Sequence, residues 1–156
     1  MMMTRSECDA VLAEKITSYL AMELEMVGHA SLLLSGGSTP RNLYHLLSLK
    51  PLDWSKIRVS MVDERFVGAN HPDRNEKYLK EIFLQNHAAN AKLVSLVQKE
   101  NDFEVNVKQA NVAAVRIIHP ITCVVLGMGE DGHTASLFPG ASNLSALMNL
   151  KDNLLD

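Results

Sequence analysis

Short apolar runs alternate along this chain with segments of helical periodicity, and this alternation constrains the fold more than any other feature. Four runs have the length and aliphatic content typical of buried strands. They cover residues 30–34, 57–62, 92–97 and 121–126. Because helical segments separate them, the sequence predicts an α/β fold with a mostly parallel, Rossmann-like sheet and helices on both faces.

The intervening segments carry recognisable helix boundaries. Helices are predicted over about residues 6–28, 39–49, 75–85 and 103–117. Ser6 is expected to cap the first helix and Gly28 to end it, while Thr39 is expected to cap the second with Pro40 at its first position. The residues of the last helix expected to face inward are Val107, Val112 (or Ala110), Ala114 and Ile117.

Length and charge narrow the class of protein. The 156 residues suit one domain, residues 1–156, and the net charge of −3 argues against nucleic acid or an acidic membrane as partner. The start lacks the apolar core of a signal peptide, and no apolar run approaches the roughly 20 residues that span a bilayer. Cys8 and Cys123 are expected to be free thiols, so a cytoplasmic protein is predicted.

Three chemically distinctive loops directly follow predicted strands. They are residues 35–40 (SGGSTP), 63–65 (DER) and 127–133 (GMGEDGH). The carboxyl ends of parallel strands lie at one edge of a sheet, where open α/β sheets bind their ligands. The strand pattern therefore predicts one site built from loops that are distant in sequence.

The first loop has the features of a phosphate cradle. Glycines allow backbone N–H groups to approach an anion, hydroxyls can donate, and a helix follows at once. The residues concerned are Ser35, Gly36, Gly37, Ser38 and Thr39. A tight strand-to-helix turn would explain the same residues, and the Gly-Lys-Ser/Thr ending of a P-loop is absent.

The second loop places two carboxylates and a guanidinium after a strand. Arg65 is suited to bind a phosphate with two hydrogen bonds, and Asp63 or Glu64 could act as a base or orient Arg65. A structural ion pair at the strand end is the alternative.

The third loop matches the G-x-G-x-x-G pattern of nucleotide-binding proteins, but no second strand with a terminal acid follows at the required distance. The better interpretation is a glycine-rich turn that presents Asp131 and His133, a possible orienting group and general base. A solvated loop histidine is the alternative. The other histidines lack metal-ligand spacing, so no metal site is expected.

Three segments together resemble a known family. Leu32–Leu47, Val59–Val67 and Leu126–Ala141 are similar to the 6-phosphogluconolactonases, within the glucosamine-6-phosphate isomerase/lactonase group. The resemblance implies a NagB/RpiA/CoA transferase-like fold, here incomplete because the chain is expected to be C-terminally truncated. It implies hydrolysis of 6-phospho-D-glucono-1,5-lactone to 6-phosphogluconate, the second step of the oxidative pentose phosphate pathway (EC 3.1.1.31), with no metal or cofactor.

The resemblance also assigns roles to residues. His133 is expected to be the general base that activates water, oriented by Asp131, and loop N–H groups near residues 127–129 are candidate oxyanion donors. The residues expected to bind the substrate and its phosphate are Ser35, Gly36, Gly37, Ser38, Thr39, Asp63, Arg65 and Gly129. The expected partner is the small sugar phosphate lactone, and a monomer is expected.

Two other activities stay open. Aminosugar isomerases of the group use an Asp where Asp63 stands, but they end the third motif in Asn-Glu-Pro, whereas this chain has residues 136–139 (SLFP). A sugar-phosphate sensor would bind ligand without turnover. The chain also departs from the family at Arg74, where a Ser is usual, so the role of that loop is an open question.

Overall fold

The computed structural model describes residues 3–117 and 121–149. The elements run in the order α1 (Arg5–Val27), β1 (Ala30–Leu34), α2 (Arg41–Ser48), η1 (Trp54–Lys56), β2 (Ile57–Met61), α3 (Asn75–Ile82), η2 (Asn86–Asn90), β3 (Lys92–Val94), α4 (Phe103–Ala114), β4 (Cys123–Val125) and α5 (Leu144–Met148). The predicted strands are therefore all present, although three of the four are shorter than predicted.

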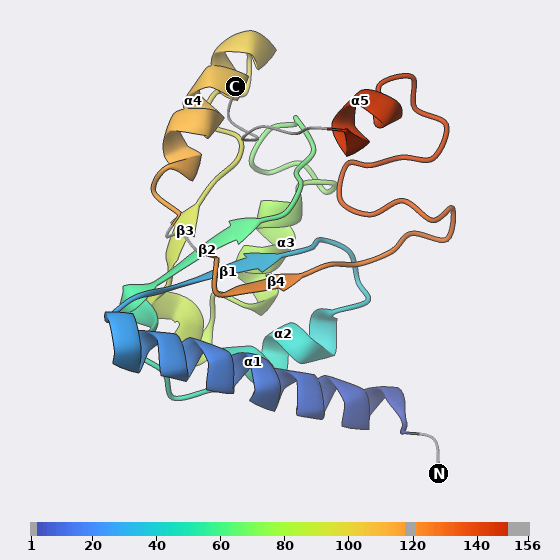
Figure 1. Cartoon of the computed structure of the whole chain (residues 1–156). Coiled ribbons are helices and arrows are strands. Elements are labelled where there is room, and N and C mark those ends of the chain that lie inside the picture. The colour runs from blue at the N-terminus through green and yellow to red at the C-terminus, as the bar shows by residue number, and fades with distance from the viewer. Residues whose placement is uncertain (1–2, 118–120, 150–156) are drawn as a thin grey trace.

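The strands form one parallel sheet in the order β3-β2-β1-β4 (Figure 1). Leu32 of β1 pairs with Val59 of β2 on one side and with Cys123 of β4 on the other. From β1 the chain steps outward through β2 to β3 and then returns to the far side of β1. The connections that leave β1 and β4 therefore run in opposite directions, and the sheet has a topological switch point between these two strands. The prediction of a parallel α/β fold is confirmed.

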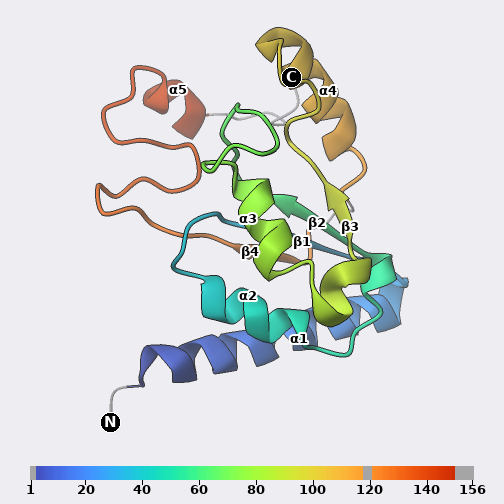
Figure 2. The ribbon, with the colours of Figure 1, turned by 180° about the vertical axis from the view of Figure 1, so that it is seen from behind.

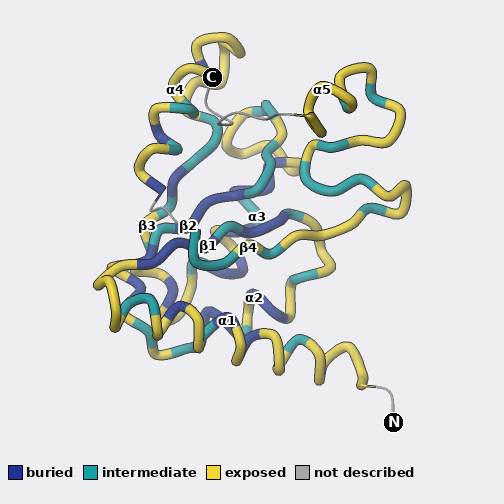
Figure 3. Tube along the Cα trace, in the orientation of Figure 1, coloured by how far each residue is buried: buried dark blue, intermediate teal, exposed yellow. Residues whose placement is uncertain are grey.

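The larger core lies on one face of the sheet. Leu32 and Leu34 of β1 are fully buried there against Ile16 and Leu20 of α1 and Leu47 of α2. Burying each such side chain contributes about 1.5–3 kcal/mol, so this layer supplies most of the apolar stabilisation. Figure 3 shows the burial concentrated in the central strands and the inward turns of the helices.

A smaller cluster covers the opposite face. It joins Ala113 of α4, the following Ile117 and Val94 of β3, with Leu33 of β1 packed against them. Figures 1 and 2 show α4 apart from the layer of α1, α2 and α3. Helices therefore lie on both faces, as predicted.

The caps of the first two helices differ from the prediction. Thr4, not Ser6, caps α1, because its side chain accepts a hydrogen bond from the backbone N–H of Glu7 while Glu7 bonds back to Thr4. Gly28 ends α1 with φ 83°, as predicted. At α2 the N-cap is Pro40 rather than Thr39, and no side chain caps the helix.

The predicted inner face of α4 is partly confirmed, because Ile117 is buried and Ala114 packs against the same cluster, but the helix is rotated so that the prediction is wrong for the two valines. Val107 and Val112 are 41% and 67% exposed, whereas Asn106 and Ala113 are buried. Asn106 fixes this rotation, because its side-chain oxygen accepts hydrogen bonds from the backbone N–H groups of residues 98 and 99 at 2.7 and 2.9 Å. A buried polar anchor thus outweighs the apolar periodicity.

Candidate active site

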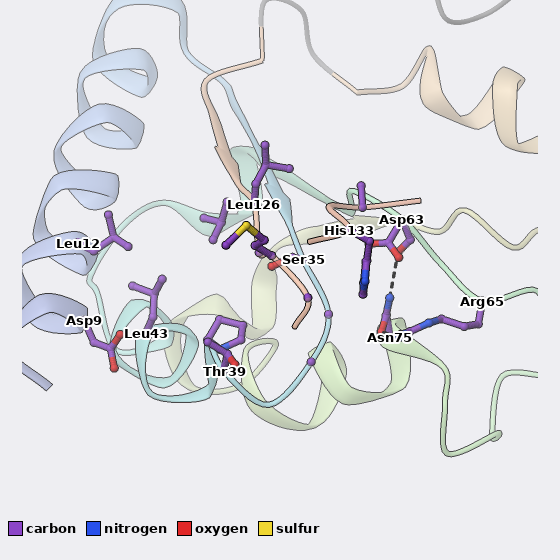
Figure 4. A pocket seen from close by; sticks show the side chains of 18 of the residues that line it. Asp9, Leu12, Ser35, Thr39, Leu43, Asp63, Arg65, Asn75, Leu126 and His133 are labelled. Carbon is purple, nitrogen blue, oxygen red and sulfur yellow. Dashed lines mark hydrogen bonds between the residues drawn. The ribbon is translucent and has the colours of Figure 1, made fainter. Parts of the chain in front are cut away.

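A cavity of about 420 Å³ opens at the carboxyl ends of β1, β2 and β4 (Figure 4). All three loops that the sequence singles out contribute to its lining. From these loops come Ser35, Gly36, Gly37, Thr39, Pro40, Asp63, Arg65, Gly127, Met128, Gly129 and His133. The structure therefore brings the loops together at the predicted edge of the sheet, beside the switch point between β1 and β4.

Tyr44 of α2 anchors the first loop. Its hydroxyl donates to the backbone carbonyl of Ser35 at 2.7 Å, and burial raises the pKa of Tyr44 to about 12. Gly37 has φ 86°, a left-handed conformation that favours glycine. Ser38 does not line this cavity but lines a neighbouring hollow of about 480 Å³ with Arg5, Thr39, Arg41, Asn42 and His45.

The three side chains of the second loop have two different roles, two facing the cavity and one binding the start of α3. Asp63 and Arg65 line the cavity. The side chain of Glu64 is only 2% exposed, and its carboxylate accepts hydrogen bonds from the backbone N–H groups of Asn75 and Glu76 at 2.8 and 2.7 Å. Glu64 thus anchors the amino end of α3, which favours the structural interpretation for this residue alone.

Arg74, whose role was open, lies behind the same loop. Its side chain is 3% exposed, and the guanidinium lies 3.2 Å from the carboxylates of both Glu64 and Glu76. It also donates to the carbonyl of Val67 at 2.7 Å. Arg74 is therefore a buried structural cation that joins the second loop to α3.

Asn75 is a cavity residue that the sequence patterns did not reveal. Its side-chain oxygen accepts a hydrogen bond from Arg65, and its amide nitrogen donates to the carbonyl of Asp63 at 3.2 Å (Figure 4). A Cβ on Gly36 would come within 3.0 Å of all three terminal atoms of this amide. Asn75 thus locks the first loop against the second, a contact between distant segments that no local pattern encodes.

The third loop contains a carboxylate–imidazole pair. Asp131 Oδ1 lies 2.5 Å from Nδ1 of His133 and also accepts a hydrogen bond from the His133 backbone N–H at 3.2 Å. These hydrogen bonds lower the pKa of the Asp131 carboxyl, so it stays ionised at neutral pH. An ionised carboxylate on Nδ1 favours the tautomer with its proton there, leaving Nε2 as an acceptor.

Gly129 makes room for this pair. A Cβ at this position would lie within 3.0 Å of both the imidazole and the Asp131 carboxylate. His133 lines the cavity, whereas Asp131 stands behind it and is not among the lining residues. This is the arrangement expected of a general base and its orienting group.

Helix α1 supplies one wall that the sequence did not predict. Arg5, Asp9 and Leu12 line the cavity, and the Arg5 guanidinium donates to the backbone carbonyl of Thr39. An amphipathic helix carries no local mark of which exposed residues will face a cavity. Arg5 is nonetheless a second guanidinium beside the candidate phosphate loop.

Within residues 3–117 and 121–149, no group of three or more His, Cys, Asp or Glu side chains is placed to hold a metal ion. None of the helices formed by these residues is long and apolar enough to cross a membrane.

Comparison with known proteins places this geometry in a family. The sequence model of the glucosamine-6-phosphate isomerases/6-phosphogluconolactonase family matches residues 3–153. The chain is 40% identical over 138 residues to a 6-phosphogluconolactonase of Rhizobium meliloti, covering 88% of this chain and 60% of the relative. A 6-phosphogluconolactonase of Pseudomonas putida is 40% identical over 141 residues, covering 90% of this chain and 58% of the relative.

Solved structures of similar fold are also found. The crystal structure of a 6-phosphogluconolactonase from Shewanella baltica superposes with a TM-score of 0.86 at 41% identity, covering 93% of this chain and 62% of that one. A monomeric glucosamine-6-phosphate deaminase shares the fold, with a TM-score of 0.71 at 23% identity, covering 90% of this chain and 59% of that one. The chain thus spans about 60% of the length of the relatives it matches.

Proposed function

The chain belongs to the family of glucosamine-6-phosphate isomerases and 6-phosphogluconolactonases, and we propose that it hydrolyses 6-phospho-D-glucono-1,5-lactone to 6-phosphogluconate. The observation that carries the proposal is the Asp131–His133 pair at the edge of a cavity that also holds a glycine-rich, hydroxyl-rich loop. The relatives near 40% identity are named for the lactonase reaction.

In the proposed reaction, Nε2 of His133 takes a proton from water as the water oxygen attacks the C1 carbonyl. Asp131 stabilises the imidazolium that forms. The tetrahedral intermediate then expels the ring oxygen, which receives the proton back from His133, and the carboxylic acid product ionises in solvent. The oxyanion requires donors, and the backbone N–H groups of residues 127–129 are the candidates.

The phosphate is proposed to bind the first loop. Gly36, Gly37 and Thr39 line the cavity, and the uncapped amino end of α2 adds a favourable dipole. Arg65 and Arg5 also line the cavity and supply positive charge. Binding energy from the phosphate would hold the distant carbonyl in place for attack. Ser35, Asp63 and Gly129 complete the proposed substrate contacts. Ser38 lines only the neighbouring hollow, and a contact between its hydroxyl and the phosphate is proposed from that side.

The remaining assignments follow from this activity. We propose a single sugar-phosphate-binding domain that works as a monomer in the cytoplasm and uses no cofactor. The pentose phosphate pathway is its proposed place in metabolism.

The test is hydrolysis of freshly prepared 6-phosphogluconolactone by the chain, with the spontaneous rate subtracted. His133→Gln should lower kcat by about 10²- to 10⁴-fold if general base catalysis operates. Lys15→Gln, an exposed change on α1, serves as the matched control and should leave the rate unchanged. An equal rate in His133→Gln would refute the proposed base.

An aminosugar isomerase is the second candidate, because Asp63 lines the same cavity. Release of ammonia from glucosamine 6-phosphate, abolished by Asp63→Asn, would establish it. Binding of 6-phosphogluconate with neither activity would instead indicate a sensor.

A further inference from the structure

One face of the His133 imidazole is covered by an aromatic ring. The ring centroids of His133 and Phe138 lie 4.6 Å apart with their planes at 23°, a stacked arrangement. Such rings attract one another beyond the apolar area that they bury. Phe138 is 47% exposed and does not line the cavity, so it contacts the imidazole from outside the site.

A tight turn brings the two rings together. Thr134 and Leu137 form an antiparallel bridge, in which the N–H of Leu137 donates to the carbonyl of Thr134 at 2.9 Å. This register places residue 138 directly opposite residue 133, where side chains on neighbouring strands meet. Ala135 adopts φ 49° inside the turn, an unfavourable conformation for a residue with a Cβ.

The same turn is bound to the loop that follows β4. The Thr134 hydroxyl donates to the carbonyl of Gly127 at 2.8 Å, and the N–H of Gly129 donates to the carbonyl of His133 at 2.8 Å. The position of Phe138 is therefore set by the backbone of the third loop. Because the turn maintains a strained residue, its geometry is held by these surrounding contacts.

The imidazole is thus confined on three sides: Asp131 holds Nδ1, the backbone of Gly129 closes on the ring edge, and Phe138 covers one face. We propose that Phe138 is a positioning residue for His133. By blocking rotation of the ring, it keeps Nδ1 on Asp131 and leaves Nε2 available to the cavity. The catalytic consequence rests on the proposed lactonase function, whereas the effect on the ring does not.

The experiment compares the chain with Phe138→Leu, which removes the aromatic face, and Phe138→Tyr, which retains it. Phe103→Leu is the matched control, because Phe103 belongs to a separate aromatic pair with Phe66. Nitrogen NMR of the His133 side chain reports the tautomer without requiring turnover. A single Nδ1–H form is expected in the parent, Phe138→Tyr and Phe103→Leu, and a mixture of tautomers in Phe138→Leu.

In the lactonase assay, Phe138→Leu should lower kcat by about 3- to 10-fold with KM unchanged, since one stacked pair is lost. Phe138→Tyr should restore the rate. Phe138→Met provides a second non-aromatic variant if Phe138→Leu fails to fold. A fixed tautomer in both non-aromatic variants would overturn the proposal. Tautomer mixing in chains that never hydrolyse the lactone would support the positioning role and refute the lactonase function instead.

Discussion

Gly36→Ala tests the contact between the first two loops of the site. Gly36 does not have a positive φ, so a methyl group causes no backbone strain there. The new Cβ would nevertheless lie within 3.0 Å of the terminal atoms of Asn75, which is 4% exposed and held at the start of α3. The amide must therefore move, and its hydrogen bonds with Arg65 and the Asp63 carbonyl are lost.

The expected loss of folding stability follows from those two hydrogen bonds. The bond to the charged Arg65 contributes about 1.5–3 kcal/mol and the neutral bond to Asp63 about 0.5–1.5 kcal/mol, so Gly36→Ala should destabilise the fold by about 2–4.5 kcal/mol. For a chain of this length that corresponds to a fall in Tm of roughly 4–18 °C. Arg65 would also be released, which should weaken binding of 6-phosphogluconate.

Urea unfolding and calorimetric titration with 6-phosphogluconate measure both effects. Gly68→Ala is the matched control, because its Cβ would meet nothing closer than a Glu100 oxygen at 3.6 Å. Asn75→Ala removes the obstacle, so adding Gly36→Ala to it should cost almost nothing more. Additive losses, or a Gly36→Ala chain as stable as Gly68→Ala, would refute the reasoning.

Four further outcomes are expected. Arg5→Gln and Arg65→Gln should each raise KM for the phosphorylated lactone but not for glucono-1,5-lactone, and equal effects on both substrates would contradict a phosphate role. Gly129→Ala should lower kcat by at least about tenfold through displacement of His133, as measured against Gly68→Ala. Asp131→Asn should lower kcat by about 10²-fold or more, because the ionised carboxylate fixes the tautomer of His133. Burial raises the pKa of Tyr44 to about 12, so the neutral hydroxyl contributes stability that is fully present below pH 10. About 2–3 kcal/mol of the free energy of unfolding should be lost as the pH rises toward 12. Urea titrations of Tyr44→Phe should not show this dependence on pH.

The sequence predicts the sheet and the meeting of the loops well, because both depend on local patterns. Alternating strands and helices imply parallel pairing, and parallel pairing places every strand's carboxyl end at one edge. The roles of the predicted site residues stay predictions. What the patterns did not reveal are Asn75 and Arg5, since each reaches the cavity through a tertiary contact with the first loop.

Polar anchors explain two of the predictions that fail, the one for the valines of α4 and the one for the cap of α1. Asn106 turns α4 toward its backbone partners and leaves Val112 exposed, against the apolar periodicity. Thr4 outcompetes Ser6 as a cap because Glu7 stands at the position that completes a capping box. In both cases a pair of side-chain to backbone hydrogen bonds decides between two arrangements that apolar spacing alone leaves nearly equal.

The second loop shows the same principle acting on the site. Its central residue, Glu64, is buried against Arg74 and the amino end of α3, and this contact directs the two flanking side chains toward the cavity. A motif of three charged residues therefore combines one structural carboxylate with two cavity groups. Removing Glu64 would leave Arg74 buried with Glu76 as its remaining carboxylate partner among the described residues. Glu64→Gln should consequently lower stability and displace Asp63 and Arg65 together, whereas Asp63→Asn, which keeps the backbone carbonyl bound by Asn75, should affect the site alone.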